Sequence, residues 1–428
     1  MQEVQFTKAQ AKKEEVETYK NSKPFFFCMF PLFTAWVLKY KWLLLFYLVV
    51  IVFFWLKRKR VEVQAKIIFL YRTSWGLSLI NYCAQKWKEW IILIGYVGVG
   101  AGYVGLVFIS YILIKNLYSL ITAPTAVAGV SLVYPGMTVP GLGVLPVWDW
   151  LLSLFLIAVI HEFSHGIVAR VHEVSVKNTG IAFFGPIPAA FVEPDEKKLR
   201  KETDIIQYSV LAAGSFSNIL LAIVAVVVLF AAVVPLQQSM IMEKGFTFDS
   251  YVESKTGEKY PFAIAGILPG TRITGLNEAP TNNFNMFAEE LAFHHPGDTI
   301  TVQTNKGQQT IVLAKSPDNP KRSFLGIKEI HDESEVQQEF QQGWRKVFFS
   351  INSWLLHFLR WLYLLSLSIG LFNLLPLPIV DGGRMAQVFL HKLHGSEKGE
   401  KRYKQISLFF LLLILLNLLY PLLVKIIK

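Results

Sequence analysis

Long apolar stretches are the feature of this sequence that most restricts its fold. A transmembrane helix needs about 20 mostly apolar residues. Five stretches reach this length: Ile91 to Ile114, Trp148 to Val171, Tyr208 to Val234, Trp354 to Leu377 and Ile406 to Ile427. A shorter run, Trp42 to Leu56, gives a sixth candidate, and Phe25 to Val37 before it either continues that helix or lies at the membrane interface. The sequence therefore predicts an α-helical polytopic membrane protein with about six transmembrane helices.

The composition supports a membrane protein and argues against several other classes. Of the 428 residues, 53% are hydrophobic and only 17% are charged. The formal net charge of +11 would suit nucleic acid, but the basic residues form short clusters beside apolar runs, so lipid headgroups are the predicted partner and nucleic acid is not. Cys28 and Cys83 are the only cysteines. Any metal must therefore be held by histidine and carboxylate side chains.

Clusters of lysine and arginine predict the orientation in the membrane. There are eight such residues in Lys57 to Lys88, four in Lys197 to Lys201 and five in Lys392 to Lys404, whereas Asn116 to Ala169 has none. The positive-inside rule places the three basic loops in the cytoplasm and the uncharged stretch on the outer side or dipping into the membrane. The polar N-terminal tail is then expected outside, and it lacks the pattern of a cleaved signal peptide. Simple solvation of these loops is an equally good explanation of their charge.

A polar segment from Met242 to Gln342 interrupts the apolar stretches and contains most of the strand signals. TITVQT (299–304) and QQTIVLA (308–314) alternate in polarity around a turn that contains Gly307, which predicts a β-hairpin. NMFAEELAF (285–293) predicts a short helix. In pattern and order the segment resembles a PDZ domain, with Pro269-Gly270-Thr271 where that family usually has Pro-Gly-Asp. Peptide capture by strand addition is one expected role, and a spacer or substrate-size filter is the alternative.

The motif HEFSHG, which begins at His161, carries the chemistry of the chain. Residues i and i+4 lie on one face of a helix, so His161 and His165 can bind one Zn2+, and Glu162 beside them can accept a proton from a metal-bound water. Ionisable side chains within a transmembrane segment are costly in free energy, so their presence there indicates a functional site. The alternative is a pair of hydrogen-bonded packing histidines beside a salt-bridged glutamate.

A catalytic zinc site usually has three protein ligands, so one more residue is required. Asp381 is the best candidate because it follows an apolar span that Pro376 and Pro378 interrupt, and Gly382-Gly383 after it allow the backbone to turn. Alternatively, Asp381 caps the inner end of a helix or pairs with Arg384.

These motifs together resemble the site-2 protease family of intramembrane metalloproteases. HEFSHG matches its HExxH helix, Gly214 to Asn218 match its GxxxN helix, and Val380-Asp381-Gly382 match its LDG-type motif, with valine in place of the usual leucine. The resemblance covers Trp148 to Met385. It implies zinc as the cofactor, one ion per chain, with transmembrane proteins as substrates.

The resemblance also implies two further functional elements. Asn218 is expected to steady the scissile carbonyl, its oxyanion or the substrate backbone, and an interhelical packing asparagine is the alternative. IAFFGPIPAAFVE (181–193) is apolar but interrupted by Gly185, Pro186 and Pro188, and it resembles the re-entrant, strand-like element of the family. Such an element can present an open edge to an unwound substrate strand.

The sequence thus predicts an intramembrane zinc metalloprotease that hydrolyses membrane-spanning proteins. Its active site is expected toward the cytoplasmic side of the cell membrane, and the sequence does not define an oligomeric state. Five segments are predicted: a tail and interfacial segment (1–41), two helices with a basic loop (42–114), a core with the HExxH and GxxxN helices (115–241), the PDZ-like insert (242–342) and the helices with Asp381 (343–428).

Two other classes remain possible from the sequence. A zinc or cation transporter also places histidine and aspartate within the membrane, but it has no need of Glu162 beside His161. A catalytically silent scaffold would use the insert to bind partner tails. The intact HExxH motif and Asp381 favour the protease.

Overall fold

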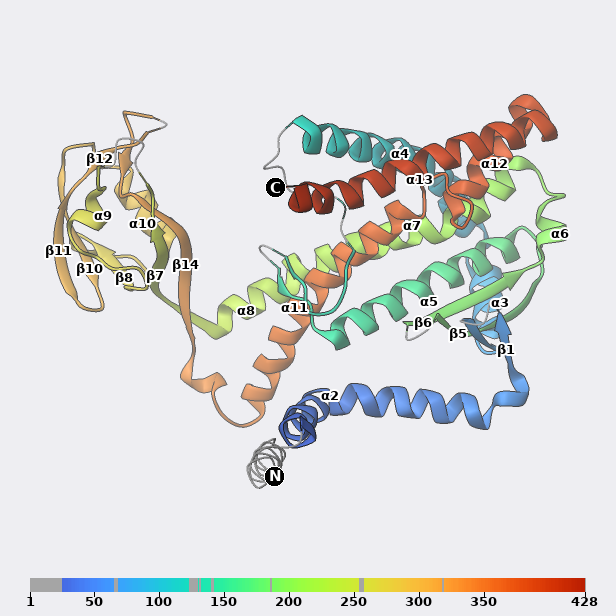
Figure 1. The fold of residues 1–428 in the computed structure, drawn as a ribbon, viewed down its shortest axis with the longest axis horizontal. Helices are drawn as coiled ribbons and strands as arrows, with labels where there is room; N and C mark the ends of the chain where they lie inside the picture. The colour runs from blue at the N-terminus through green and yellow to red at the C-terminus, as the bar shows by residue number, and fades with distance from the viewer. Residues whose placement is uncertain are drawn as a thin grey trace, which may run out of the picture. The chain divides into compact units, whose positions relative to one another are not determined.

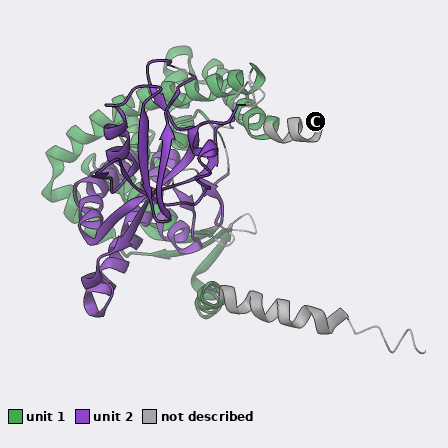
Figure 2. Cartoon of the chain, turned by 90° about the vertical axis from the view of Figure 1, so that its left-hand side faces the viewer, with its two compact units in different colours: residues 1–131, 154–217, 370–428 green, residues 132–153, 218–369 purple. Residues whose placement is uncertain are grey.

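The computed structural model describes residues 25–427 apart from 65–67, 123–129, 131, 140–141, 185–186, 254–257 and 318. The predicted N-terminal tail falls outside the described residues up to residue 24. The chain divides into two compact units (Figure 2). Unit 1 comprises 1–131, 154–217 and 370–428, and unit 2 comprises 132–153 and 218–369.

Five helical segments of the described chain are long and apolar enough to cross a membrane (Figure 1). They are α4 (Lys88–Thr122), α5 (Val147–Val171), the continuous run Asp204–Met240, α11 (Gly343–Phe372) and the part Ser396–Tyr420 of α13 (Ser396–Ile427). The run Asp204–Met240 consists of α7 (Asp204–Val228), a π-helical turn η2 (Leu229–Val233) and α8 (Val234–Met240). The sixth predicted span lies in α2 (Phe25–Leu56), whose described apolar part, Lys41–Leu56, is shorter than the others. The count of six therefore stays a prediction.

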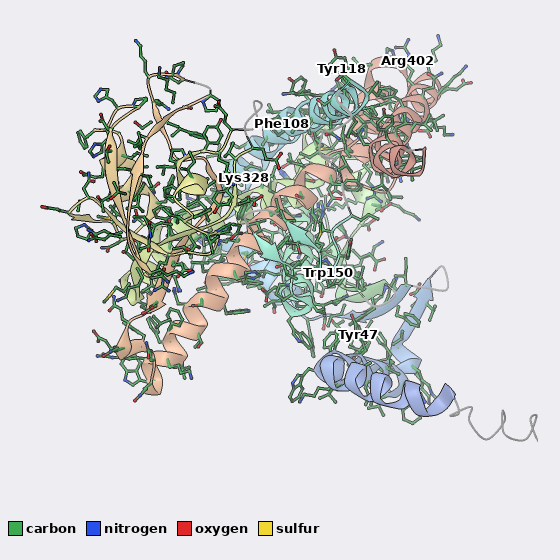
Figure 3. All side chains as sticks on the ribbon, turned by 60° about the vertical axis from the view of Figure 1, so that its left-hand side comes forward. Tyr47, Phe108, Tyr118, Trp150, Lys328 and Arg402 are labelled. Atoms are coloured by element: carbon green, nitrogen blue, oxygen red, sulfur yellow. The ribbon has the colours of Figure 1, made fainter. Side chains whose placement is uncertain are left out.

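Helix α4 shows how these helices combine lipid-facing and packing surfaces. Phe108 and Tyr118 are 51% and 68% exposed and extend from the helix (Figure 3), as expected for side chains that face lipid. Small residues on a buried stripe allow close approach of neighbouring helices. At Gly102, a Cβ atom would meet Ala212 of α7 and Met385. Gly102 thus allows α4 to pack closely against these neighbours.

A four-stranded antiparallel sheet in unit 1 has the strand order β1-β2-β5-β6. Its strands are β1 (Val61–Gln64), β2 (Ile68–Thr73), β5 (Val176–Phe184) and β6 (Ile187–Pro194). The segment predicted to be strand-like indeed contains the paired strands β5 and β6, and residues 185–186 lie outside the described residues. Within the described sheet, β6 is an edge strand.

The polar insert forms a sheet with the order β11-β10-β8-β7-β14, in which β9 pairs with β8. The predicted hairpin is confirmed as β10 (Thr299–Thr304) and β11 (Gly307–Val312), and the predicted helix as α10 (Phe284–Leu291). The other strands are β7 (Ile241–Tyr251), β8 (Ile273–Leu276), β9 (Ala279–Pro280) and β14 (Ile327–Val336). Its buried core includes Phe246, Phe248, Phe262 and Phe287. A PDZ-like identity stays a prediction.

Short elements complete the fold. They are η1 (Arg58–Arg60), α3 (Leu77–Lys86), β3 (Thr138–Val139), β4 (Gly143–Val144), α6 (Glu196–Leu199), α9 (Pro261–Ile264), β12 (Ala314–Lys315), β13 (Ser323–Phe324) and η3 (Gln338–Phe340).

The chain breaks between α11 and α12 (Asp381–His394), as the prolines predicted. Helix α11 ends at Phe372 rather than at Leu377, because Pro376 and Pro378 disfavour helix in the residues before them. A Cβ atom at Gly382 would lie 2.0 Å from the Leu374 carbonyl oxygen. A Cβ atom at Gly383 would lie 1.7 Å from the Leu377 carbonyl oxygen. The two glycines therefore allow α12 to start directly against the preceding turn, which determines where Asp381 lies.

Candidate metal centre and active site

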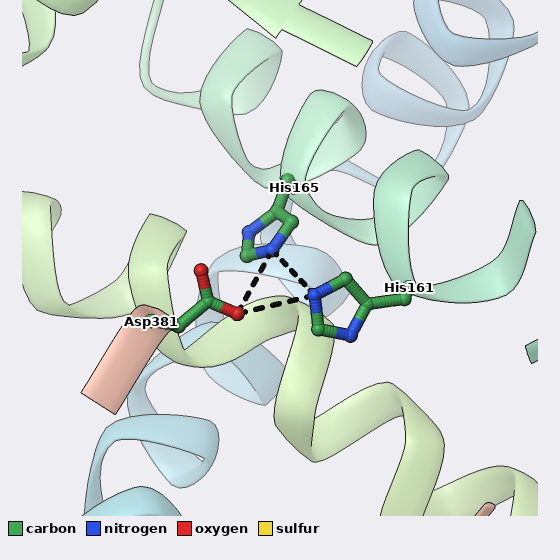
Figure 4. A group of neighbouring side chains, drawn as sticks. All are labelled: His161, His165 and Asp381. Atoms are coloured by element: carbon green, nitrogen blue, oxygen red, sulfur yellow. Dashed lines mark hydrogen bonds and ion pairs between the residues drawn. The ribbon is translucent and has the colours of Figure 1, made fainter. Parts of the chain in front are cut away.

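Three candidate metal ligands meet in unit 1. His161 and His165 lie one turn apart on α5, and Asp381 is the first residue of α12 (Figure 4). The two Nε2 atoms are 3.1 Å apart, and Asp381 Oδ2 lies 3.1 Å from that of His161 and 3.3 Å from that of His165. Residues more than two hundred positions apart thus place three ligand atoms in one small triangle. Among the described residues, this is the one such group of three or more.

The triangle has the dimensions of a zinc site. Ligand atoms about 2.0–2.1 Å from a tetrahedral zinc ion are roughly 3.3–3.4 Å apart. The observed separations of 3.1 to 3.3 Å are slightly shorter, so small outward movements would accommodate the ion. Two imidazoles and one carboxylate also match the donor set of catalytic zinc sites, which retain a fourth position for water or substrate.

Contacts around the triangle keep its ligand atoms available. The Nδ1 atom of His165 donates to the Val210 carbonyl oxygen of α7 at 2.7 Å. A carbonyl only accepts hydrogen bonds, so Nδ1 carries a proton and Nε2 is the ring nitrogen that faces the other two candidate ligands. Burial by itself disfavours the Asp381 carboxylate, but the neighbouring histidines more than offset this effect and hold its pKa below the usual range. Asp381 is therefore held in the ionised form that binds metals.

Gly214 of α7 provides the space for the two imidazoles. A Cβ atom at this position would lie 2.4 Å from His165 Nε2 and 2.5 Å from His161 Nε2. These separations are shorter than van der Waals contact, so a side chain at residue 214 displaces the ligands. This glycine is the first residue of the GxxxN motif, but only the three-dimensional structure reveals its steric function.

Glu162 lies beside the candidate ligands and contacts the sheet. Its Oε2 atom accepts a hydrogen bond of 3.1 Å from the backbone N–H of Val192 in β6. Glu162, His165 and Asp381 line one cavity of about 480 Å³ together with residues at the end of β6. The contact between the sheet edge and the glutamate was not predicted, because it joins segments thirty residues apart without a sequence signal of its own.

Asn218 belongs to unit 2 and is fully buried. It lies one turn beyond Gly214 on α7, so helix geometry places both residues on the same face. Its backbone carbonyl accepts a hydrogen bond of 2.7 Å from the Ser366 hydroxyl. Its predicted role toward substrate stays a prediction.

The alternatives for Asp381 do not match its surroundings. Val380, not Asp381, is the N-cap of α12, and Asp381 lies inside the helix. Arg384 pairs with Glu196, at 3.0 Å between Nη2 and Oε1.

Two other histidines have partners away from the triangle: His391 contacts Glu400 and His294 contacts Asn277.

The fold and the site are those of a membrane protein with a candidate metal centre, and comparison with known proteins assigns its family. The chain matches Peptidase family M50 over residues 150–418, more than half of its length. It therefore belongs to this family, the site-2 protease family of zinc metalloproteases. Together with the five apolar helices, this membership supports a multi-pass membrane protein.

Two relatives are similar over shorter regions. Protease RseP of Photorhabdus luminescens is 38% identical over 52 residues, which are 12% of this chain and 23% of that protein. "Putative zinc metalloprotease NMA0084" of Neisseria meningitidis serogroup A / serotype 4A (strain DSM 15465 / Z2491) is 25% identical over 192 residues, which are 33% of this chain and 43% of that protein. The chain thus matches less than half the length of each relative.

Proposed function

We propose that this chain is an intramembrane zinc metalloprotease that cleaves membrane-spanning proteins. The observation that carries the proposal is the ligand triangle of His161, His165 and Asp381, with Glu162 in the same cavity. A transporter or a silent scaffold has no need of a carboxylate base beside the ligands, and family membership supports neither alternative.

In this proposal, the three ligands hold one zinc ion per chain. The bound ion would polarise the scissile carbonyl and lower the pKa of water toward 7. Glu162 accepts a proton as the water oxygen adds to the carbonyl carbon, and delivers a proton to the nitrogen as the C–N bond breaks. Asn218 donates its side-chain amide to the carbonyl oxygen or holds the substrate backbone. Its position on the Gly214 face of α7 supports this role.

The open edge of β6 is the proposed docking strand for substrate. The Val192 N–H points to Glu162 rather than into the β5–β6 ladder. Backbone groups alternate between the two sides of an antiparallel strand, so Ala190 presents its N–H on the same outer side. A substrate strand that pairs there would lie beside the base, and strand addition would unwind a helical substrate before cleavage.

The basic loops support an orientation for the reaction. His161 and His165 lie in the last three turns of α5, and the segment that follows leads to the cluster Lys197 to Lys201. The positive-inside rule assigns that cluster to the cytoplasm. Cleavage is therefore proposed in the inner half of the cell membrane, and the insert is proposed on the outer side as a substrate filter.

The substitution Glu162→Gln tests the proposal directly. Purified wild-type and variant proteins are loaded with zinc and incubated with a transmembrane peptide. Loss of the general base is expected to lower the cleavage rate by about 100-fold or more, while bound zinc stays unchanged because Glu162 is not a ligand. Cleavage by the variant at the wild-type rate would refute the mechanism. Zinc flux into vesicles without cleavage would favour the transporter.

A further inference from the structure

An ion pair joins two segments that border the candidate ligands. Arg384 lies one turn after Asp381 on α12, and Glu196 follows the end of β6 by two residues. Their side chains meet at 3.0 Å. The pair thus connects the segment that carries a metal ligand with the segment that follows the proposed docking strand.

The same two residues lie where two cavities adjoin. The first cavity, of about 480 Å³, contains Glu162, His165 and Asp381. The second, of about 430 Å³, is lined by polar residues of α7 and α12. Both cavities share Glu196, Leu199, Leu211 and Arg384. The ion pair is therefore part of the lining of the active-site cavity itself.

The Glu196 side of the pair is firmly attached to the sheet. Asp195 caps the short helix α6, and its side chain accepts hydrogen bonds from the backbone N–H groups of Lys197 and Lys198. The Asp195 N–H donates to the Ser175 carbonyl oxygen at 2.8 Å, directly before β5. A displacement of Glu196 is therefore transmitted to the β5–β6 hairpin.

The Arg384 side of the pair is equally well fixed. Gly382 donates its N–H to the Asn373 carbonyl oxygen at 2.8 Å, and Gly383 donates to that of Val380. The close contact of both glycines with the preceding turn leaves little space for α12 to shift independently. Arg384 and Asp381 therefore move together.

We propose that Glu196 and Arg384 are positioning residues, whose ion pair holds the docking strand β6 at the correct distance from the metal ligand Asp381. This inference rests on the proposed protease function. Both side chains are 54% exposed, and exposed ion pairs contribute little to folding stability. Misplacement of reacting groups by about 1 Å, in contrast, can lower a rate by roughly 100-fold. The pair is therefore expected to affect catalysis more than stability.

Charge reversal separates a positioning role from a merely structural one. Glu196→Arg and Arg384→Glu are each expected to lower kcat/KM by about 10-fold, mainly through a higher KM, because the docking edge is displaced. The double variant, in which the charges are exchanged, is expected to return to within about twofold of wild type. The matched control is Lys392→Glu, which lies on α12 like Arg384 and breaks the ion pair of Lys392 with Asp204 of α7. Both control residues line only the second cavity, so kcat/KM should stay near the wild-type value.

A second measurement does not depend on activity. Amide hydrogen exchange in 187–194, which contains the Val192 N–H, is expected to be faster in each single reversal and to recover in the double variant. Unchanged exchange and unchanged kcat/KM in the single variants would overturn the proposal, as would a double variant no better than the single ones. If the wild-type protein cleaves no peptide, the proposed function fails, and the exchange data still decide whether the pair positions β6.

Discussion

At the scale of single residues, the candidate metal centre depends on side chains whose direction is set by a second contact. His165 is oriented by the Val210 carbonyl, and Asp381 by the tight start of α12. Outer contacts of this kind typically change metal affinity by about 10- to 100-fold when they are lost. Removal of a ligand is expected to cost more.

The variant His165→Ala is therefore predicted to lose zinc. Its affinity for zinc should fall by more than roughly 100-fold, which is the largest effect typical of losing an outer contact. Equilibration with a zinc-buffering chelator, followed by metal analysis of the purified protein, measures this effect. His391→Ala is the control, since His391 contacts Glu400 away from the triangle. Equal zinc content in both variants would remove His165 from the ligand set.

Gly214→Ala is predicted to damage the site although alanine favours helix. Alanine is the better helix former by about 1 kcal/mol, but its Cβ atom would lie within 2.6 Å of both imidazoles. Zinc content and cleavage should fall together. Gly100→Ala on α4 is the matched control, because no atom lies within 4 Å of its added Cβ. A Gly214→Ala protein with full zinc content would show that the ligands can move aside at no cost.

At the scale of elements, strand β6 combines an open edge with sequence signals that fit one. Pro188 cannot donate a ladder hydrogen bond, and prolines in sheets are confined to edges, ends and bulges. Pro188, Ala190 and Val192 are two residues apart along β6, so their backbone nitrogens face the same, outer side of the strand. Pro188 thus lacks an N–H where no ladder hydrogen bond is required. The strand therefore tolerates proline at positions on the proposed docking side.

Ala190→Pro is predicted to block substrate without unfolding the sheet. The substitution removes one outward N–H from the docking edge and leaves the β5–β6 ladder intact. Cleavage should fall by about 5- to 13-fold, as expected for loss of a backbone hydrogen bond at about 1–1.5 kcal/mol, while zinc content stays normal. Ala190→Val keeps the N–H and should remain active. Full activity of Ala190→Pro would argue against strand addition at this residue.

At the scale of the whole molecule, the insert has a hydrophobic core of its own. Its cluster of buried residues lies entirely between Phe246 and Leu325. Ile241 at the start of β7 pairs with Val336 at the end of β14, so the chain enters and leaves at neighbouring points. Cα atoms of such pairs are about 5 Å apart, a distance that a short linker spans.

Replacement of residues 242–335 by a short Gly/Ser linker is predicted to leave the metal centre intact. The three ligands belong to unit 1, whereas the insert belongs to unit 2. Zinc content should equal that of the full chain, and cleavage of bulky substrates should rise relative to that of short peptides if the insert is a filter. An excised fragment 241–337 should unfold cooperatively in denaturant. Loss of zinc from the shortened protein would contradict the independence of the centre.

Much of the fold could be predicted because its signals are local. Apolar length identified five helices long enough to cross a membrane, and alternation around Gly307 identified the β10–β11 hairpin. Element ends were less accurate: α11 stops at Phe372, since prolines act on the residues before them. The candidate ligands His161 and His165 followed from helical spacing, whereas Asp381 needed a ligand count and a family pattern.

The sequence by itself determined the membrane class, the HExxH pair and the strand-rich insert, because periodicity, apolar length and turn residues are properties of neighbouring positions. Only the tertiary structure decided that Gly214 makes space for the imidazoles, that Val210 orients His165 and that Glu162 contacts the edge of β6. These contacts join segments distant in the chain, and they arise from how helices and strands pack. Short-range sequence patterns do not encode such packing, so the environment of the site became visible only in three dimensions.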